Sequence, residues 1–148
     1  SNAKRHVWNL ENQRQRPLKR HDDTDSWTYT TASYRQANGS AANQLDFVLG
    51  IESPVFALVH AMSASNSNAR WRRTAIGLDG TTAIGITGQV TETGGEVGMS
   101  TAAYLQQTAV GRHYLVWLEM SSAAGTTTWY GDNGGAEALS GMVGSVWG

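Results

Sequence analysis

The chain has 148 residues, no cysteine and a net charge of −1. A single domain of this length buries roughly 70% of the surface that its unfolded chain would expose, so it can fold without disulfides or a structural metal. The lack of cysteine excludes disulfide frameworks, thiolate zinc sites and cysteine nucleophiles, and the balanced charge favours no class of partner.

A polar, basic segment opens the chain. The triplet Ser1–Ala3 is typical of the remnant of a cleaved expression tag and is set aside. Residues 4–24 have no apolar periodicity and are predicted to form an N-terminal arm, with Val7, Trp8 and Leu10 docking on the body or on another chain. Six of the eleven Lys and Arg residues lie in the first twenty positions. The body has no basic patch with interleaved aromatics, so no nucleic-acid partner is expected.

The remainder of the chain has the pattern of β-strands separated by turns. It is rich in Gly and Trp, with 17 and six residues, and poor in strong helix formers. The run 55–64 is continuously apolar, which predicts a central strand buried on both faces. The segment 97–105 suits a strand or a short helix, and the segment after 86 suits a loop or an edge hairpin. The predicted strands, in chain order, are 27–35, 44–51, 55–64, 70–78, 81–86, 97–105, 112–120, 126–130 and 142–147.

Eight or nine strands with regularly spaced turns predict an all-β fold. We expect an antiparallel β-sandwich of the jelly-roll kind, which occupies residues 25–148 as one domain. The sequence has no internal repeat that would indicate a solenoid or a propeller. It also has no apolar run close to the ~20 residues of a membrane span, so no membrane insertion is expected.

No catalytic or metal-binding pattern stands out in the sequence. Nucleophile-elbow and phosphate-loop motifs are absent, so we expect no enzyme activity and no cofactor. The four histidines show no spacing typical of a metal site, and His60, in its apolar run, suits a core histidine. His113 could meet Glu119 or Asp46 across a sheet. Glycoside hydrolysis would need two carboxylates about 5–10 Å apart, and Asp79, Glu96 and Asp132 are further acids in the chain.

Two short stretches contain the candidate ligand-binding residues. The first, 125–135, has Trp129, Tyr130 and Asp132 between glycines, and the second has Arg70 and Trp71. The first stretch follows 112–120 after a glycine turn, so its first half is best interpreted as the return strand of a hairpin. Successive strand residues point to opposite faces, so we expect one of the two aromatic side chains to pack inside and the other to face outward.

Three long stretches resemble a domain of bacteriophage and prophage virion proteins of the tail-fibre or minor structural type. They are "DSWTYTTASYRQANGSAANQLDFVLG" (25–50), "IGLDGTTA" (76–83) and "GRHYLVWLEMSSAAGTTTWYGDNG" (111–134), and the resemblance extends over about residues 16–147. No catalytic residues come with it. Residues 85–101 match nothing in the pattern, and we interpret them as a variable region of the kind that often serves recognition.

The resemblance implies a β-sandwich head on a virion fibre or spike, assembled as a homotrimer. Its partners would be further copies of itself, other virion proteins, and a glycan or protein receptor on the host cell. The expected location is the virion, after synthesis in the bacterial cytoplasm. A purely architectural decoration or adaptor protein is the first alternative, and a carbohydrate-active enzyme is the second.

Overall fold

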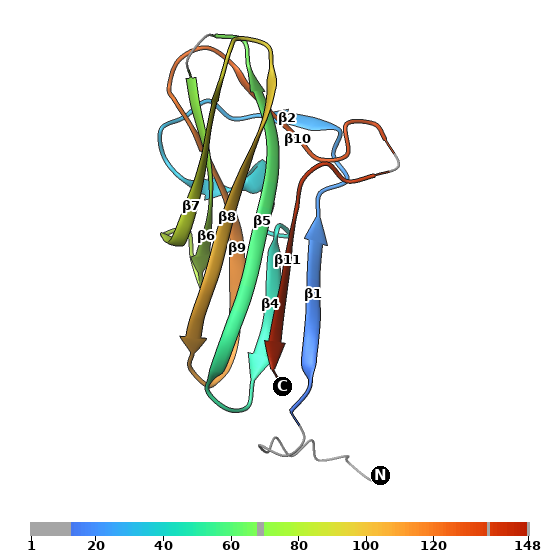
Figure 1. The fold of residues 1–148 in the computed structure, drawn as a ribbon, viewed down its shortest axis with the longest axis vertical. Helices are drawn as coiled ribbons and strands as arrows, with labels where there is room; N and C mark the ends of the chain where they lie inside the picture. The colour runs from blue at the N-terminus through green and yellow to red at the C-terminus, as the bar shows by residue number, and fades with distance from the viewer. Residues whose placement is uncertain (1–12, 68–69, 136, 148) are drawn as a thin grey trace.

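Two four-stranded antiparallel layers face each other in this computed structural model, which describes residues 13–67, 70–135 and 137–147 (Figure 1). Sheet I has the order β1–β11–β5–β8, and sheet II has the order β4–β9–β6–β7. A single bridge between Ile86 and Ala103 joins β7 to β8, so the layers are continuous at one edge. The bounds in sheet I are β1 (Gln15–His21), β11 (Gly141–Trp147), β5 (Ser53–Ser65) and β8 (Val97–Thr108). Those in sheet II are β4 (Gln44–Leu49), β9 (Gly111–Ser121), β6 (Arg70–Leu78) and β7 (Ala83–Glu92).

The predicted antiparallel jelly-roll sandwich is confirmed. Strands far apart in sequence are neighbours, such as β1 with β11 and β4 with β9, as expected for this kind of fold. Eight long strands and three short ones give eleven among the described residues, which is more than the eight or nine predicted. These are β2 (Ser26–Thr28), β3 (Arg35–Gln36) and β10 (Thr127–Tyr130), and a 3₁₀ turn, η2 (Ala37–Gly39), follows β3.

The apolar core lies between the two sheets because alternate residues of each strand point inward. Along β5 the inward positions are small or branched, from Val55 to Ala61, and across the gap Trp117 of β9 is fully buried. Its ring meets that of Trp27 edge to face, with the centroids 6.0 Å apart. Aromatic pairs prefer this arrangement, and it adds to the apolar area that both rings bury.

Some strand boundaries differ from the prediction. The segment 27–35 is a strand only at its two ends, in β2 and at Arg35 of β3. β2 pairs with β10 alone, and the chain then crosses the end of the sandwich before β3 pairs with β9. There Thr31 accepts a hydrogen bond from the backbone N–H of Ser121, and Tyr34 packs on the outer side of sheet II. The ambiguous segment 97–105 is a strand, β8, and β7 continues to Glu92, well beyond the predicted end.

Part of the predicted arm belongs to the sandwich. Residues 15–21 form β1, which pairs with β11 in register from Gln15–Trp147 to His21–Gly141. The alternation is hidden in the sequence because only Leu18 among the inward positions is apolar, while Arg16 and Arg20 are basic. Val7, Trp8 and Leu10 lie outside the described residues.

A buried carboxylate holds the crossing segment to sheet II. Glu119 of β9 is fully buried and accepts hydrogen bonds from Trp27 Nε1 at 2.7 Å and from Arg35 Nε at 2.8 Å. The backbone N–H of Asn38, in η2, donates to the same carboxylate at 3.2 Å. Burial raises the pKa of Glu119, and the hydrogen bonds from Trp27, Arg35 and Asn38 lower it. Burial is the larger effect, so the pKa is about 7.

Stability should fall as the pH rises through this group's titration range. The folded state holds the Glu119 proton up to a pKa of about 7, whereas the unfolded chain releases it near the ordinary glutamate pKa of 4.5. The folded state therefore binds more protons between these values, and unfolding becomes easier with rising pH by up to about 3 kcal/mol. Chemical denaturation at pH 4.5 to 8 measures this trend, and Glu119→Gln should flatten it. A wild-type stability that rises across this window would contradict the expectation.

Candidate functional site

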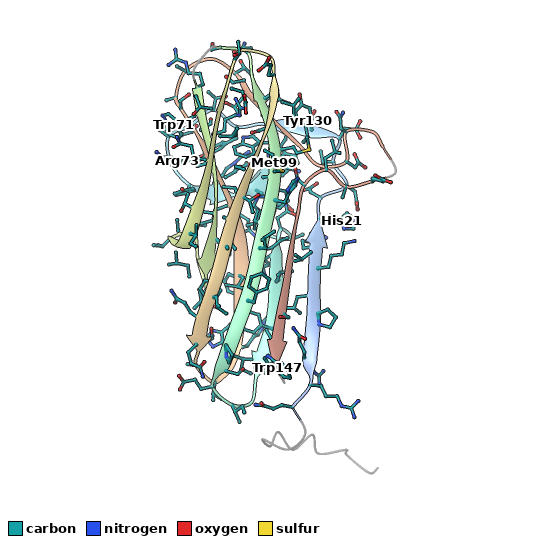
Figure 2. The ribbon with its side chains drawn as sticks, viewed as in Figure 1. His21, Trp71, Arg73, Met99, Tyr130 and Trp147 are labelled. Atoms are coloured by element: carbon teal, nitrogen blue, oxygen red, sulfur yellow. The ribbon has the colours of Figure 1, made fainter. Side chains whose placement is uncertain are left out.

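The candidate residues of the β10 hairpin do not share a surface. Trp129 is fully buried in the core and donates from Nε1 to the backbone carbonyl of Tyr29 at 3.3 Å. Tyr130 is half-buried and points to the other side of the strand, next to Met62 of β5 (Figure 2). This confirms that the two aromatic side chains face opposite ways. Asp132 uses Oδ1 to accept the Gly134 N–H at 3.0 Å, which closes the turn after β10. Trp129 therefore offers a ligand no surface, contrary to its selection as a binding residue.

Trp129→Phe tests this structural role. The change removes the indole N–H bond and part of the buried volume, so the free energy of unfolding should fall by about 1–3 kcal/mol. Urea denaturation measures it. Tyr130→Phe is the matched control on the same strand. It should change the free energy of unfolding by less than about 0.5 kcal/mol, because substitutions outside the core usually have effects of that size. An unchanged stability for Trp129→Phe would exclude the core role.

The second candidate pair is divided between the two sides of β6. Trp71 faces outward, where the guanidinium carbon of Arg73 lies 4.6 Å from its ring centroid (Figure 2). Arg70 is half-buried, and its Nε has no hydrogen-bond partner within the described residues. The sequence analysis did not select Arg72, which points inward, is fully buried and donates from Nε to Ser63 Oγ at 3.0 Å. Burial lowers the pKa of Arg72, while nearby Glu92 opposes this effect.

His113 and Asp79, two of the titratable side chains that sequence reasoning considered for chemistry, are engaged in structural contacts. His113 meets neither Glu119 nor Asp46, because its Nδ1 lies 2.7 Å from Asp79 Oδ2 and its Nε2 lies 3.1 Å from the Ala109 carbonyl. Both ring nitrogens are thus occupied. Burial alone would raise the pKa of Asp79, but hydrogen bonds from His113 and from the backbone of Tyr114 lower it. Among residues 13–67, 70–135 and 137–147, no three His, Cys, Asp or Glu side chains gather as a metal site would need.

The outer face of sheet I is the most unusual surface of the molecule. It exposes large apolar side chains from three adjacent strands and the neighbouring edge, each between 40% and 70% accessible to solvent. The labelled Met99 and Trp147 lie toward opposite ends of this face (Figure 2). We call it the apolar face, and its members are Phe56, Ile86, Val97, Met99, Leu105, Val143 and Trp147.

Charge distribution separates this face from the other side of the sandwich. The three strands β5, β8 and β11 contain no Asp, Glu, Lys or Arg, whereas the outer side of sheet II presents Asp46, Arg73 and Arg112. The outward residues of β5 include Phe56, Leu58 and His60, so the run that was predicted to be buried on both faces is buried on one face only. Contiguous exposed apolar surface of this kind marks an interaction site more often than a free surface.

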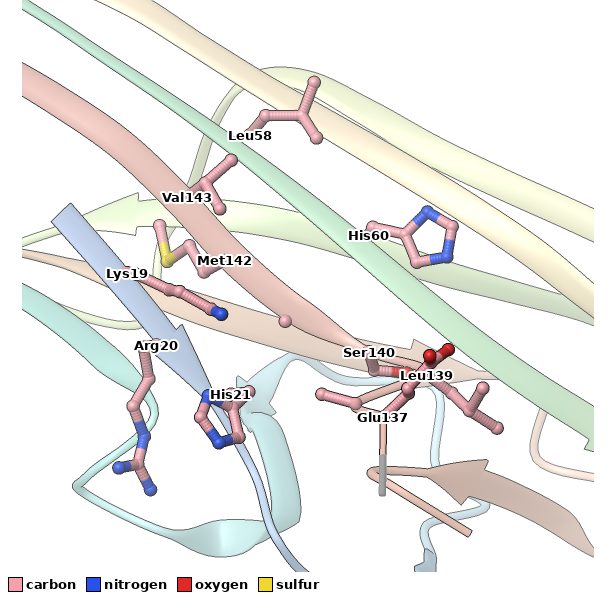
Figure 3. Close-up of a pocket in the computed structure, with 12 residues that line it drawn as sticks. Lys19, Arg20, His21, Leu58, His60, Glu137, Leu139, Ser140, Met142 and Val143 are labelled. Atoms are coloured by element: carbon pink, nitrogen blue, oxygen red, sulfur yellow. The ribbon is translucent and has the colours of Figure 1, made fainter. Parts of the chain in front are cut away.

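A pocket of about 520 Å³ adjoins the apolar face at the β1 side (Figure 3). β1 contributes Lys19 and His21, β5 contributes Leu58 and His60, and residues 137–143 complete the wall. His60 therefore points outward into the pocket, unlike the core histidine that the sequence suggested. The pocket was missed because β1 looked like an arm. The outward positions 17, 19 and 21 become recognisable only once β1 is placed beside β11.

Together, the strand order and the two packed sheets define an antiparallel jelly-roll sandwich. No model of a known protein family matches the chain, and no curated protein sequence matches it. Among solved structures, Eiger TNF from S. frugiperda is similar with a TM-score of 0.53, 6% sequence identity, and coverage of 88% of this chain and 90% of that chain. At this identity the likeness shows the fold alone. Within the described residues, no helix has the length and apolar character needed to cross a membrane.

Proposed function

We propose that the protein is a self-associating structural domain of a bacteriophage virion, a homotrimer that contacts the host surface. The apolar face of sheet I is the observation that supports self-association most directly. Cores of protein interfaces are depleted in charge and enriched in aromatic residues and Met, and this face has that composition. A second copy of the chain is the occupant that we assign to it.

The size of the face suits a stable contact. The three strands β5, β8 and β11, about 4.8 Å apart and roughly ten residues long at ~3.3 Å per residue, cover on the order of 500 Å² before side-chain relief is added. A specific interface should bury at least about 1,000 Å² in total, which is about 500 Å² on each partner. The face reaches this lower limit, and the low overall content of charged residues, 16%, suits a chain that covers surface in an assembly.

The virion role rests on the sequence resemblance over residues 16–147, and the host-surface role rests on the end of the sandwich. There the loops around 66 and 93–96 come together, as shown by the Gly95 N–H to Ser65 carbonyl bond, and Tyr130 and Trp71 lie on opposite sides of this end (Figure 2). Loops on a rigid sheet scaffold are the usual place for recognition.

Binding of the purified protein to host bacteria and to a glycan array tests the recognition role. Specific binding that Tyr130→Ala or Trp71→Ala weakens would support it. A stable oligomer that binds neither cells nor glycans would favour the architectural alternative. Release of reducing sugar, lost on replacement of a single carboxylate, would establish an enzyme and overturn the proposal. Neighbouring genes that encode no capsid, portal or tail protein would remove the virion context.

A further inference from the structure

Two histidines and a lysine surround a gap in the outer surface of sheet I. His21 of β1 is directly opposite Gly141 of β11, and Gly141 is directly opposite His60 of β5. Strands lie about 4.8 Å apart, so the two histidine backbones are separated by roughly 10 Å with no side chain between them. The gap is a trough whose two walls are imidazole rings.

Gly141 is required at the bottom of this trough. A Cβ placed there would lie 2.9 Å from the Arg20 carbonyl oxygen and 3.5 Å from His21 Cβ. A side chain would therefore crowd β1 and fill the space between the rings. Two residues along the strands, the cross-strand neighbours on the same face are Lys19, Val143 and Leu58. Val143 and Leu58 form an apolar floor, and Lys19 adds an ammonium group.

The charged groups around the trough favour an anion over a cation. Lys19 is cationic, and both imidazoles become cationic when protonated, whereas Glu137 is the acid that lines the pocket (Figure 3). His21 Nε2 lies 2.8 Å from Asp23, which leaves its Nδ1 for another contact. Arg20 lines the pocket, but its guanidinium group turns inward, and Nε donates to Asn43 Oδ1 at 3.2 Å. From β8, the residue beside His60 is the uncharged Thr101.

We infer that this pocket binds the oxyanion of a small acidic saccharide, a carboxylate or a phosphate, between His60 and Lys19. A pocket of about 520 Å³ is within the range of ~300–1,000 Å³ typical of small-molecule sites, and it combines an apolar floor with a few polar groups as such sites do. Charge-assisted hydrogen bonds from ammonium and imidazolium groups to an oxyanion are among the stronger ones in proteins.

The inference rests on the proposed recognition function, for which it names the ligand chemistry. Every lining residue comes from one chain, and the pocket opens at the β1 side of the apolar face, so the self-contact that we assign to that face has to leave this edge uncovered.

Titration calorimetry with three probes tests the inference. Glucuronate represents a sugar carboxylate, glucose 1-phosphate represents a sugar phosphate, and glucose is the neutral control. At least one acidic probe should bind in the millimolar range, and the stronger of the two identifies the source of the oxyanion. Lys19→Ala and His60→Leu should each weaken binding about fivefold or more.

Arg112→Ala is the matched control, because it removes an exposed cation from the opposite sheet. It should leave the affinity unchanged, and the melting temperature of each variant verifies that it folds. The inference is overturned by equal binding of glucose, by no binding of either acid, or by affinities that Lys19→Ala and His60→Leu leave unaltered. If neither acid binds but the oligomer still binds host cells, the inference fails and the proposed function stands. If an acid binds but the protein binds neither host cells nor other virion proteins, the inference stands and the proposed function fails.

Discussion

Replacing Glu119 with alanine should destabilise the fold by about 3–5 kcal/mol, a large part of the ~5–15 kcal/mol that holds a typical domain together. The carboxylate accepts hydrogen bonds from Trp27, Arg35 and the backbone of Asn38, and its side chain is completely buried. Removing it leaves three donors without their acceptor, of which Arg35, with a side chain that is 33% exposed, is the one partly open to water. Urea denaturation at pH 7 measures the loss.

Two variants show whether the loss comes from this network. Glu96→Ala removes an exposed acid from the β7–β8 turn and should change the stability by less than about 0.5 kcal/mol. Glu119→Gln keeps the shape of the side chain, so it should lose less stability than alanine. If Glu119→Ala unfolded at the wild-type urea concentration, the carboxylate would not be the anchor of the crossing segment.

Leu105→Asp should abolish self-association while leaving the monomer folded. Leu105 is 68% exposed on the apolar face and lies directly opposite Phe56 of β5. An acid at this position would be desolvated in an interface formed by β5, β8 and β11, and these three strands carry no cationic side chain to pair with it. The penalty of several kcal/mol for a buried unpaired charge exceeds what most interfaces can absorb. Sedimentation velocity of the variant should therefore show monomer at concentrations where the wild type is assembled.

Val48→Asp provides the matched control for this substitution. Val48 is 53% exposed, so the change from apolar to acidic side chain is comparable, but it lies on β4 in sheet II. It should leave the assembly intact, and both variants should keep a wild-type circular dichroism spectrum. An equal effect of the two substitutions would indicate non-specific aggregation, and an intact Leu105→Asp oligomer would place the interface elsewhere.

Local pattern predicted the strands but not which strand faces remain exposed. The alternation in 44–49 and the apolar runs at 55–64 and 112–120 marked β4, β5 and β9 nearly to the residue. An apolar run such as that of β5 looks the same whether its second face is covered by its own chain or by another. The sequence could therefore not reveal that Phe56 and Leu58 point outward.

Three features could not be predicted from the sequence because they depend on contacts between distant segments: β1, the pocket and the hydrogen bonds of Glu119. β1 has polar outward and basic inward residues, and only its register with β11 identifies it as a strand. The pocket of Lys19, His21 and His60 depends on this pairing, because its histidines are 39 positions apart. Glu119 looked like any acid in a strand, since its partners Trp27, Arg35 and Asn38 come from a segment that crosses the sandwich. By contrast, the opposite orientations of Trp129 and Tyr130 follow from strand geometry alone and were predicted.

The mass of the wild-type protein in solution tests the central claim most directly. Light scattering coupled to size-exclusion chromatography, over a hundredfold range of concentration at neutral pH, should give three times the 15.9 kDa mass of one chain. The apolar face would then be covered by neighbouring copies, as we propose. A mass of a single chain at every concentration would contradict the claim and leave that face without the occupant assigned to it.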